Sequence, residues 1–167
     1  MTDTLFTRRF FLGAGGTAAA ASLLLIRTGS AAAAADRGHY EITRSSAEWR
    51  HALGAERYAV LREAATETPG SSPLLREHRK GIFACAGCGQ PVFSSETKFE
   101  SGTGWPSFFR PLPKAIVTRS DRTLGFERTE VLCRRCGGHL GHVFDDGPPP
   151  TGLRYCMNGL ALVFRPA

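Results

Sequence analysis

The cysteines carry the clearest chemical pattern in this chain. Four of the five form two C-x-x-C units, each followed by glycine, over residues 85–89 and 133–137. Two intervening residues let both sulfurs of one tight turn reach a single ion, and the glycine accepts the unusual backbone angles of that turn. Four thiolates leave no coordination position open for chemistry. We therefore expect one structural zinc ion (Zn2+), held by Cys85, Cys88, Cys133 and Cys136.

Two other interpretations of the paired cysteines stay open. An exported protein could form two disulfides from four cysteines, and one C-x-x-C unit could act as a redox centre. The trailing glycines are hard to explain in a disulfide framework, and a second redox unit would be redundant. The two units are further apart than in a compact zinc ribbon, so the metal would join distant parts of the fold.

The fifth cysteine, Cys156, lies in segment 153–158, Leu-Arg-Tyr-Cys-Met-Asn. In a strand, alternation places Arg154, Cys156 and Asn158 on one face and the apolar residues on the other. A guanidinium beside Cys156 favours the thiolate, which is the nucleophilic form. We expect a reactive cysteine here, the alternative being an inert one on an ordinary surface strand.

Two histidines and a tryptophan are further candidates. His139 and His142 follow the second cysteine unit, and an imidazole that titrates near neutrality can supply protons. They could also be solvated, or replace two cysteines as metal ligands. Trp105 lies in the glycine-rich segment 101–108, where it either lines a pocket or packs in the core.

Local patterns predict a mainly β fold with short N-terminal helices. Ser45-x-x-Glu48 is a capping box that opens a short helix, and residues 55–64 have helical spacing. Residues 66–73 form a turn-rich connection. Beyond them, short apolar runs bounded by turn residues favour strands. The predicted strands are 81–84, 91–93, 115–118, 124–132 and 152–164, with a hairpin turn at residues 121–122.

Length and composition limit the class of protein. The chain has 167 residues, with 42% apolar and 22% charged residues, which is typical of a globular protein. That length suffices for one domain after a targeting segment is removed. The net charge is +6, but basic residues alternate with acidic ones. We therefore expect no nucleic-acid partner, and we expect a monomer.

The N-terminus resembles a bacterial twin-arginine signal peptide. Thr7-Arg8-Arg9-Phe-Phe-Leu precedes an apolar, Gly/Ala-rich stretch, and residues 31–35 supply small residues for cleavage. The resemblance implies a signal peptide at 1–35, a linker at 36–44 and a single domain at 45–167. The protein would take up its metal in the cytoplasm and be exported, folded, to the periplasm. A Sec signal, or membrane anchoring by an uncleaved signal, are the alternatives.

From about residue 45 to the C-terminus, the chain resembles the B-type methionine sulfoxide reductases. The resemblance rests on Cys-Ala-Gly-Cys-Gly at 85–89, Lys-Phe-Glu-Ser-Gly-Thr-Gly-Trp-Pro-Ser-Phe at 98–108, Cys-Arg-Arg-Cys-Gly-Gly-His-Leu-Gly-His-Val-Phe-Asp-Asp-Gly-Pro at 133–148 and Gly-Leu-Arg-Tyr-Cys-Met-Asn at 152–158. It implies two twisted antiparallel sheets, with zinc on the side away from the pocket. It also implies repair of oxidised proteins by reduction of methionine (R)-sulfoxide.

The resemblance assigns roles to matching positions. Cys156 would be the nucleophile, and Trp105 would hold the substrate methyl group. The other catalytic positions fall on His139, His142 and Asn158, and further substrate contacts fall on Phe144 and Arg154. The thiolate would attack the sulfoxide sulfur, and His142, supported by His139, would protonate the departing oxygen. Cys156 would be left as a sulfenic acid.

The chain departs from the family pattern at two positions. Many members carry a resolving cysteine at the position of Thr103, so here an external thiol, thioredoxin-like or small, would reset the enzyme. Gly159 stands where serine is expected, with no evident consequence. Two rival functions are a zinc-ribbon binding module with an unreactive Cys156, and a thiol-disulfide oxidoreductase without zinc.

Overall fold

The computed structural model describes residues 40–167. The predicted signal peptide and the first part of the linker lie outside these residues. The described chain begins with helix α1 (Ser46–Glu63), opened by the predicted capping box: the Glu48 N–H donates to the Ser45 hydroxyl at 3.2 Å, and the Ser45 N–H donates to the Glu48 carboxylate at 2.7 Å. Gly54 breaks the helix into two stretches, which confirms the predicted short helices. None of the described helices has both the length and the apolar character to cross a membrane.

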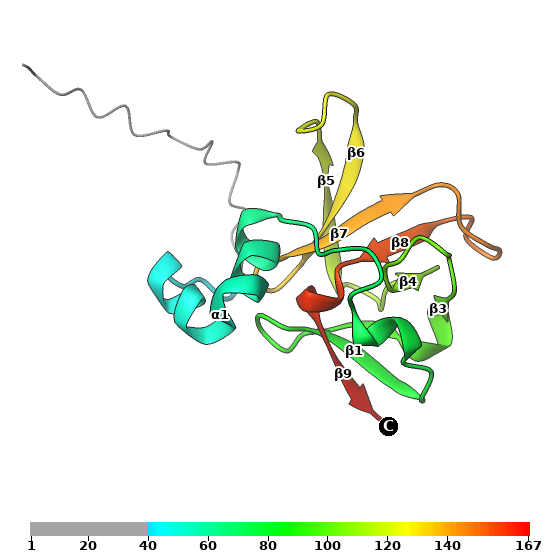
Figure 1. Cartoon of the computed structure of the whole chain (residues 1–167), viewed down its shortest axis with the longest axis horizontal. Helices are drawn as coiled ribbons and strands as arrows, with labels where there is room; N and C mark the ends of the chain where they lie inside the picture. Colours follow the sequence, from blue (N-terminus) through cyan, green and yellow to red (C-terminus); the bar gives the residue numbers. More distant parts are fainter. Residues whose placement is uncertain (1–39) are drawn as a thin grey trace, which may run out of the picture. The chain divides into compact units, whose positions relative to one another are not determined.

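Two antiparallel sheets follow α1, as predicted (Figure 1). The small sheet has the order β2-β1-β9 and contains β1 (Gly81–Cys85), β2 (Pro91–Ser94) and β9 (Leu162–Pro166). The large sheet has the order β3-β4-β8-β7-β6-β5 and contains β3 (Lys98–Phe99), β4 (Ser107–Phe108), β5 (Ile116–Asp121), β6 (Arg128–Cys133), β7 (His139–Phe144) and β8 (Arg154–Met157). The described chain also contains three 3-10 turns: η1 (Pro73–Arg76) lies between α1 and β1, η2 (Ser95–Thr97) between β2 and β3, and η3 (Gly159–Ala161) between β8 and β9.

An aromatic cluster joins the two sheets. Phe83 on β1 and Phe93 on β2 meet Phe108 on β4, and all three side chains are fully buried. The ring centroids of Phe93 and Phe108 lie 4.4 Å apart in a stacked arrangement, and those of Phe83 and Phe108 lie 4.9 Å apart edge to face. Each such pair adds about 0.5–1.5 kcal/mol to the stabilisation from burial alone. This cluster fixes the position of β4, which is the neighbour of β8 in the large sheet.

The predicted strand 152–164 is wrong as a single element. The segment divides into β8 in the large sheet and β9 in the small sheet, with η3 between them. The Glu67 carboxylate stabilises this turn, because it accepts hydrogen bonds from the N–H groups of Gly159 at 2.5 Å and Leu160 at 2.9 Å. The chain therefore crosses between sheets at the point where a buried carboxylate satisfies its backbone donors.

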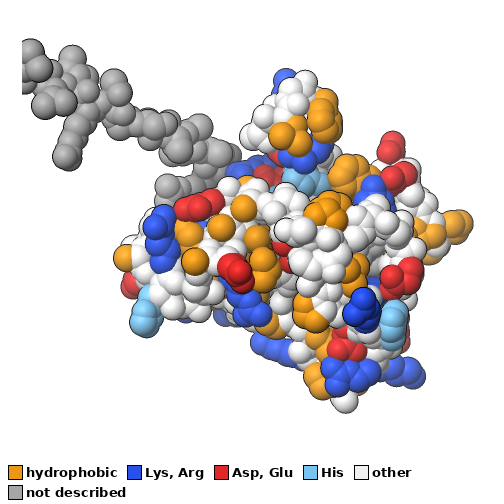
Figure 2. Space-filling view, in the orientation of Figure 1, with side chains coloured by type: hydrophobic (Ala, Val, Ile, Leu, Met, Phe, Trp, Pro, Cys, Tyr) orange, Lys and Arg blue, Asp and Glu red, His pale blue; other side chains and the backbone are white. Residues whose placement is uncertain are grey.

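The β5–β6 hairpin also differs from prediction. β5 extends to Asp121 and β6 begins at Arg128, so the connection spans residues 122–127 instead of turning at 121–122. Leu124 and Phe126 at its tip are 61% and 58% exposed. Figure 2 shows this hairpin standing out from the body of the molecule with apolar side chains at its end. The predicted strand 124–132 included these residues because of their apolar character.

Candidate metal centre and active site

The four paired cysteines meet at one point, as predicted. Their sulfur atoms all lie within 4.8 Å of one another. Cys85 and Cys136 have a sulfur separation of 3.8 Å, and Cys88 and Cys133 have one of 3.5 Å. Tetrahedral zinc with bonds of about 2.3 Å requires sulfur separations of about 3.8 Å. The spacing and the soft thiol donors therefore fit a tetrahedral metal ion, with no disulfide among the described cysteines.

The trailing glycines shape both cysteine turns. The N–H groups of Gly89 and Gly137 donate to the carbonyls of Cys85 and Cys133, each at 2.8 Å. The two glycines have φ angles of 73° and 67°, which other residues adopt only with strain. Cys85 ends β1 of the small sheet and Cys133 ends β6 of the large sheet. The cluster therefore joins the two sheets, as the wide separation of the units predicted.

Contact between the thiols alters their acidity. Hydrogen bonding with the neighbouring thiols raises the pKa of Cys85, which burial raises further, and the same contacts lower the pKa of Cys88. Four adjacent thiols cannot all ionise without a cation to balance their charge. α1 contacts the second cysteine turn, because the Arg62 guanidinium donates to the Cys136 carbonyl at 2.9 Å.

Cys156 lies near the middle of the large sheet. Its strand β8 runs between β4 and β7, and the residues opposite Cys156 are Ser107 and His142. The thiol is only partly buried. The Thr103 hydroxyl lies 3.8 Å from its sulfur, and the Met157 N–H donates to the Pro106 carbonyl at 2.9 Å. The glycine-rich segment 101–106 therefore lies against the reactive candidate.

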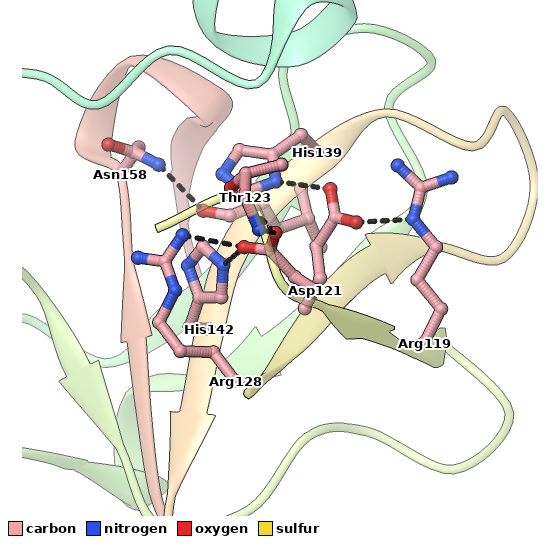
Figure 3. A network of polar contacts seen from close by, with 9 residues as sticks. Arg119, Asp121, Thr123, Arg128, His139, His142 and Asn158 are labelled. Atoms are coloured by element: carbon pink, nitrogen blue, oxygen red, sulfur yellow. Dashed lines mark hydrogen bonds and ion pairs between the residues drawn. The ribbon is translucent and has the colours of Figure 1, made fainter. Parts of the chain in front are cut away.

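The two candidate histidines both come from β7, which was not predicted as a strand. Their ring centroids lie 5.3 Å apart. Nε2 of His142 lies 2.8 Å from an Asp121 carboxylate oxygen, and Nδ1 of His139 lies 2.6 Å from a Glu130 carboxylate oxygen (Figure 3). Since an ionised carboxylate only accepts, each of these ring nitrogens carries a proton. Neither histidine belongs to the metal cluster, so the interpretation of this pair as metal ligands is wrong.

Each carboxylate is in turn held by an arginine. Arg128 donates to Asp121 at 2.6 Å, and Arg119 pairs with Glu130. Asp121 and Arg128 lie opposite one another in the β5–β6 register, as do Arg119 and Glu130. The hairpin therefore presents two matched carboxylate–arginine pairs to the β7 histidines (Figure 3).

These contacts set the protonation of the network. Burial favours a raised pKa for Asp121, but hydrogen bonds from Thr123, His142 and Arg128 outweigh it and hold the pKa well below its usual range. Burial alone would also raise the pKa of Glu130, but hydrogen bonds from His139 and Arg119 outweigh burial and lower it. Burial lowers the pKa of His142, and Arg128 adds to this effect, while the bond to Asp121 opposes it. Neutral His142 beside a charged carboxylate is therefore the resting state at neutral pH.

Sequence reasoning missed the four charged residues of the hairpin. The available signal was the spacing Arg119-x-Asp121 on one strand and Arg128-x-Glu130 on the next. Residues two apart in a strand share a face, so opposite charges would pair across such a hairpin.

His139 adds a further sign of function. It is 3% exposed, and its Nε2 has no hydrogen-bond partner among the described residues.

The predicted substrate-contact residues come from three segments: Trp105 from the glycine-rich segment, Phe144 from β7 and Arg154 from β8. Trp105 is only half-buried, and its indole N–H donates to the Glu67 carbonyl at 3.1 Å. Phe144 ends β7 opposite Arg154 on β8, and the guanidinium lies 4.4 Å from the centre of its ring. Asp146 holds Arg154 with two hydrogen bonds, at 2.9 and 2.8 Å, which raise the pKa of Arg154.

Asn158 does not continue the strand face of Arg154 and Cys156 as predicted, because β8 ends at Met157. Its side chain is buried at 4% exposure. The amide oxygen accepts from the Glu67 N–H at 3.0 Å, and the amide nitrogen donates to the Leu140 carbonyl at 3.4 Å. Since Glu67 also accepts from Trp105, Asn158 helps to fix the connection on which Trp105 rests.

Comparison with known proteins identifies the family. Residues 53–166 match the SelR domain. The chain is 52% identical over 127 residues to the peptide methionine sulfoxide reductase MsrB of Agrobacterium fabrum, covering 75% of this chain and 94% of the relative. It is 49% identical to MsrB of Leptospira interrogans (76% and 98% covered) and 53% identical to MsrB of Leifsonia xyli (79% and 96% covered). The chain therefore belongs to the SelR family, the B-type methionine sulfoxide reductases.

Proposed function

We propose that this protein is an oxidoreductase that reduces methionine (R)-sulfoxide in oxidised proteins, with Cys156 as its nucleophile. The position of Cys156 carries the proposal. Among the described cysteines, Cys156 alone lies outside the four-cysteine cluster, and it lies opposite His142 in the register of β7 and β8. Family membership supports the reaction class.

The proposed first half-reaction moves two electrons from one sulfur to the other. The Cys156 thiol ionises, and His142, which is neutral at rest, takes up the released proton. The thiolate then attacks the sulfoxide sulfur, and His142 gives this proton to the oxygen. The sulfoxide S–O bond breaks as oxygen passes to the Cys156 sulfur. Methionine leaves reduced, and Cys156 is oxidised to the sulfenic acid. His139, with a free Nε2 among the described residues, is the second group able to exchange a proton with the oxygen.

The proposed second half-reaction uses external thiols. One thiol attacks the sulfenic acid, releases water and forms a mixed disulfide with Cys156. A second thiol then attacks this disulfide and releases the Cys156 thiol. Thr103 occupies the position 3.8 Å from the Cys156 sulfur where an internal thiol would otherwise act. This contact supports a thioredoxin-like or small-thiol reductant.

We also propose the substrate contacts. Trp105 holds the methyl group of the sulfoxide, because its ring is fixed through the indole N–H and is not absorbed into the core. Phe144 extends this apolar wall. Arg154, fixed by Asp146, lies on the same strand as Cys156 and contacts the substrate from there.

Cys85, Cys88, Cys133 and Cys136 would hold one Zn2+ ion, since their sulfur separations and donor type suit it. When bound, the ion would supply stability only, because four thiolates fill its tetrahedral shell. We further propose export by the twin-arginine route to the periplasm, on the pattern of residues 7–12. The substrates would then be oxidised exported proteins, and the enzyme would act as a monomer.

A single-turnover assay tests the proposed reaction. Zinc-loaded protein is mixed with separate R and S epimers of a methionine-sulfoxide peptide without reductant, and its intact mass is then measured. We expect conversion of the R epimer alone and one added oxygen, located on Cys156. Cys156→Ser should convert neither epimer and keep its zinc. Conversion by Cys156→Ser, or equal conversion of both epimers by the unchanged protein, would contradict the proposal.

A further inference from the structure

Three hydroxyl groups form a continuous chain that ends at Cys156. Ser107 and Ser101 have an oxygen separation of 2.7 Å, Ser101 and Thr103 have one of 2.8 Å, and Thr103 lies 3.8 Å from the Cys156 sulfur. At the other end, the Ser107 hydroxyl reaches the Trp105 carbonyl at 3.1 Å. Ser107 is 1% exposed, so its hydroxyl depends on protein partners.

Counting protons gives this chain two allowed orders. Each hydroxyl has one proton to donate and can accept from its neighbours. When Cys156 is a thiol, its S–H donates to Thr103, Thr103 to Ser101, Ser101 to Ser107, and Ser107 to the Trp105 carbonyl. When the sulfur is ionised, the order reverses, and Ser107, Ser101 and Thr103 each donate toward Cys156. In both orders the Thr103 N–H also donates to the Ser101 oxygen, at 3.4 Å.

We propose that this hydroxyl chain reverses when Cys156 ionises, so that Thr103 donates to the thiolate and afterwards to the oxygen of the sulfenic acid. The inference rests on the proposed function and deepens it. Thr103 touches the reacting sulfur, whereas Ser101 and Ser107 are positioning residues that orient it. The protein has no resolving cysteine at position 103. The Thr103 hydroxyl there instead stabilises the sulfenic acid of Cys156 until an external thiol arrives.

The register of the sheet explains why the chain is aimed at this sulfur. Ser107 lies directly opposite Cys156 across β4 and β8, and the Met157 N–H binds the Pro106 carbonyl. These contacts fix the segment that carries Thr103 on one side of the thiol. The Trp105 carbonyl gives up its hydrogen bond from Ser107 on reversal, but a hydrogen bond to a charged acceptor is stronger than one between neutral groups.

One variant that deletes the Thr103 hydroxyl and one that preserves it test the proposal in the zinc-loaded enzyme. Thr103→Val keeps the shape of the side chain and removes the hydroxyl, while Thr103→Ser keeps the hydroxyl. Two quantities are measured: the pH at which Cys156 alkylation by iodoacetamide reaches half its maximal rate, and the lifetime of the sulfenic acid after one turnover. For Thr103→Val we expect the alkylation midpoint at higher pH and a sulfenic acid lost about tenfold faster. Thr103→Ser should restore both values.

Ser101→Ala provides a second test that leaves Thr103 in place. It removes the link to Ser107, so we expect a smaller shift of both quantities in the same direction. Unchanged values in Thr103→Val and Ser101→Ala, or a Thr103→Ser variant that behaves as Thr103→Val, would overturn the proposal. Alkylation does not require substrate, so it tests the hydroxyl chain even if the unchanged enzyme forms no sulfenic acid. Failure of the unchanged enzyme to form a sulfenic acid would instead contradict the proposed function.

Discussion

The four-cysteine cluster and the Cys156 site use the same side chain in opposite ways. In the cluster, each thiol lies against other thiols, and Cys85 and Cys133 are fully buried. Cys156 is partly exposed and faces a hydroxyl instead of a second thiol. Metal binding needs several sulfurs close together, whereas nucleophilic attack needs one sulfur with access and a nearby proton donor. The neighbours of each cysteine, more than its own chemistry, determine which role it can have.

The two regions are nevertheless connected through β7. The second cysteine turn ends immediately before this strand, and the Cys133 N–H donates to the Gly138 carbonyl at 2.9 Å. Leu132 pairs with His139 at the same point. The cluster therefore fixes the start of the strand that carries both histidines. Damage to the cluster should reach the Cys156 site, whereas damage at Cys156 should leave the cluster intact.

Removal of one cluster ligand should have the largest effect. We expect Cys136→Ser to lose most bound zinc and cooperative unfolding, because structural zinc contributes about 10–16 kcal/mol against a typical net stability of about 5–15 kcal/mol. Metal analysis and thermal unfolding measure both. Cys156→Ser is the matched control and should keep full zinc and an unchanged melting temperature. A stoichiometric, cooperatively folded Cys136→Ser protein would show that the cluster does not hold the fold together.

Loss of the proposed acid should have the next largest effect. We expect His142→Asn to lower the single-turnover rate with the R epimer by about 10²–10⁴-fold, which is the usual contribution of a positioned proton donor. Zinc content and melting temperature should change little. His51→Asn, at an exposed position on α1, is the control and should retain the full rate. A full rate in His142→Asn would show that His142 is not the proton donor and would leave His139 as the candidate.

The charged neighbours of His142 should shift the pH profile in opposite directions. The proposed acid must be protonated, so the single-turnover rate should fall as pH rises above the lowered pKa of His142. Asp121 opposes that lowering and Arg128 adds to it. Asp121→Asn should therefore move the fall to lower pH and reduce the rate at pH 7 about tenfold, and Arg128→Gln should move it to higher pH. Shifts in the same direction would mean that another group titrates.

The same lowered pKa gives a sign for stability. The folded state binds the His142 proton less readily than the unfolded chain, whose histidine pKa is about 6.5. The contribution of His142 to folding is thus present above about pH 6.5 and is lost as pH falls through the folded value. The melting temperature of the unchanged protein should therefore fall relative to that of His142→Asn as pH drops below about 6.5. A melting temperature that instead rises relative to that of His142→Asn on acidification would contradict the direction of this pKa shift.

Local patterns predicted the elements that depend on neighbours in sequence. The capping box at Ser45 and the glycine-ended cysteine turns need only a few adjacent residues. β7 was missed because its histidines and Gly141 interrupt the apolar pattern, and they do so because the strand carries the candidate proton donors. The division of 152–164 depends on Glu67, which is more than ninety residues from Gly159 in sequence. Such long-range contacts leave no local periodicity to detect.

Introducing a thiol at position 103 should have the smallest effect on the first half-reaction and a clear effect on the second. The Thr103 hydroxyl lies 3.8 Å from the Cys156 sulfur, and a disulfide needs about 2.05 Å, so a modest movement of the segment suffices. After one turnover, Thr103→Cys should form a disulfide with Cys156, release water and lose two hydrogens from its intact mass. Thr118→Cys is the control, because β5 lies three strands away from β8, about 14 Å. If Thr103→Cys keeps an added oxygen instead, the segment cannot close on Cys156, and an external thiol would be needed even with a cysteine at that position.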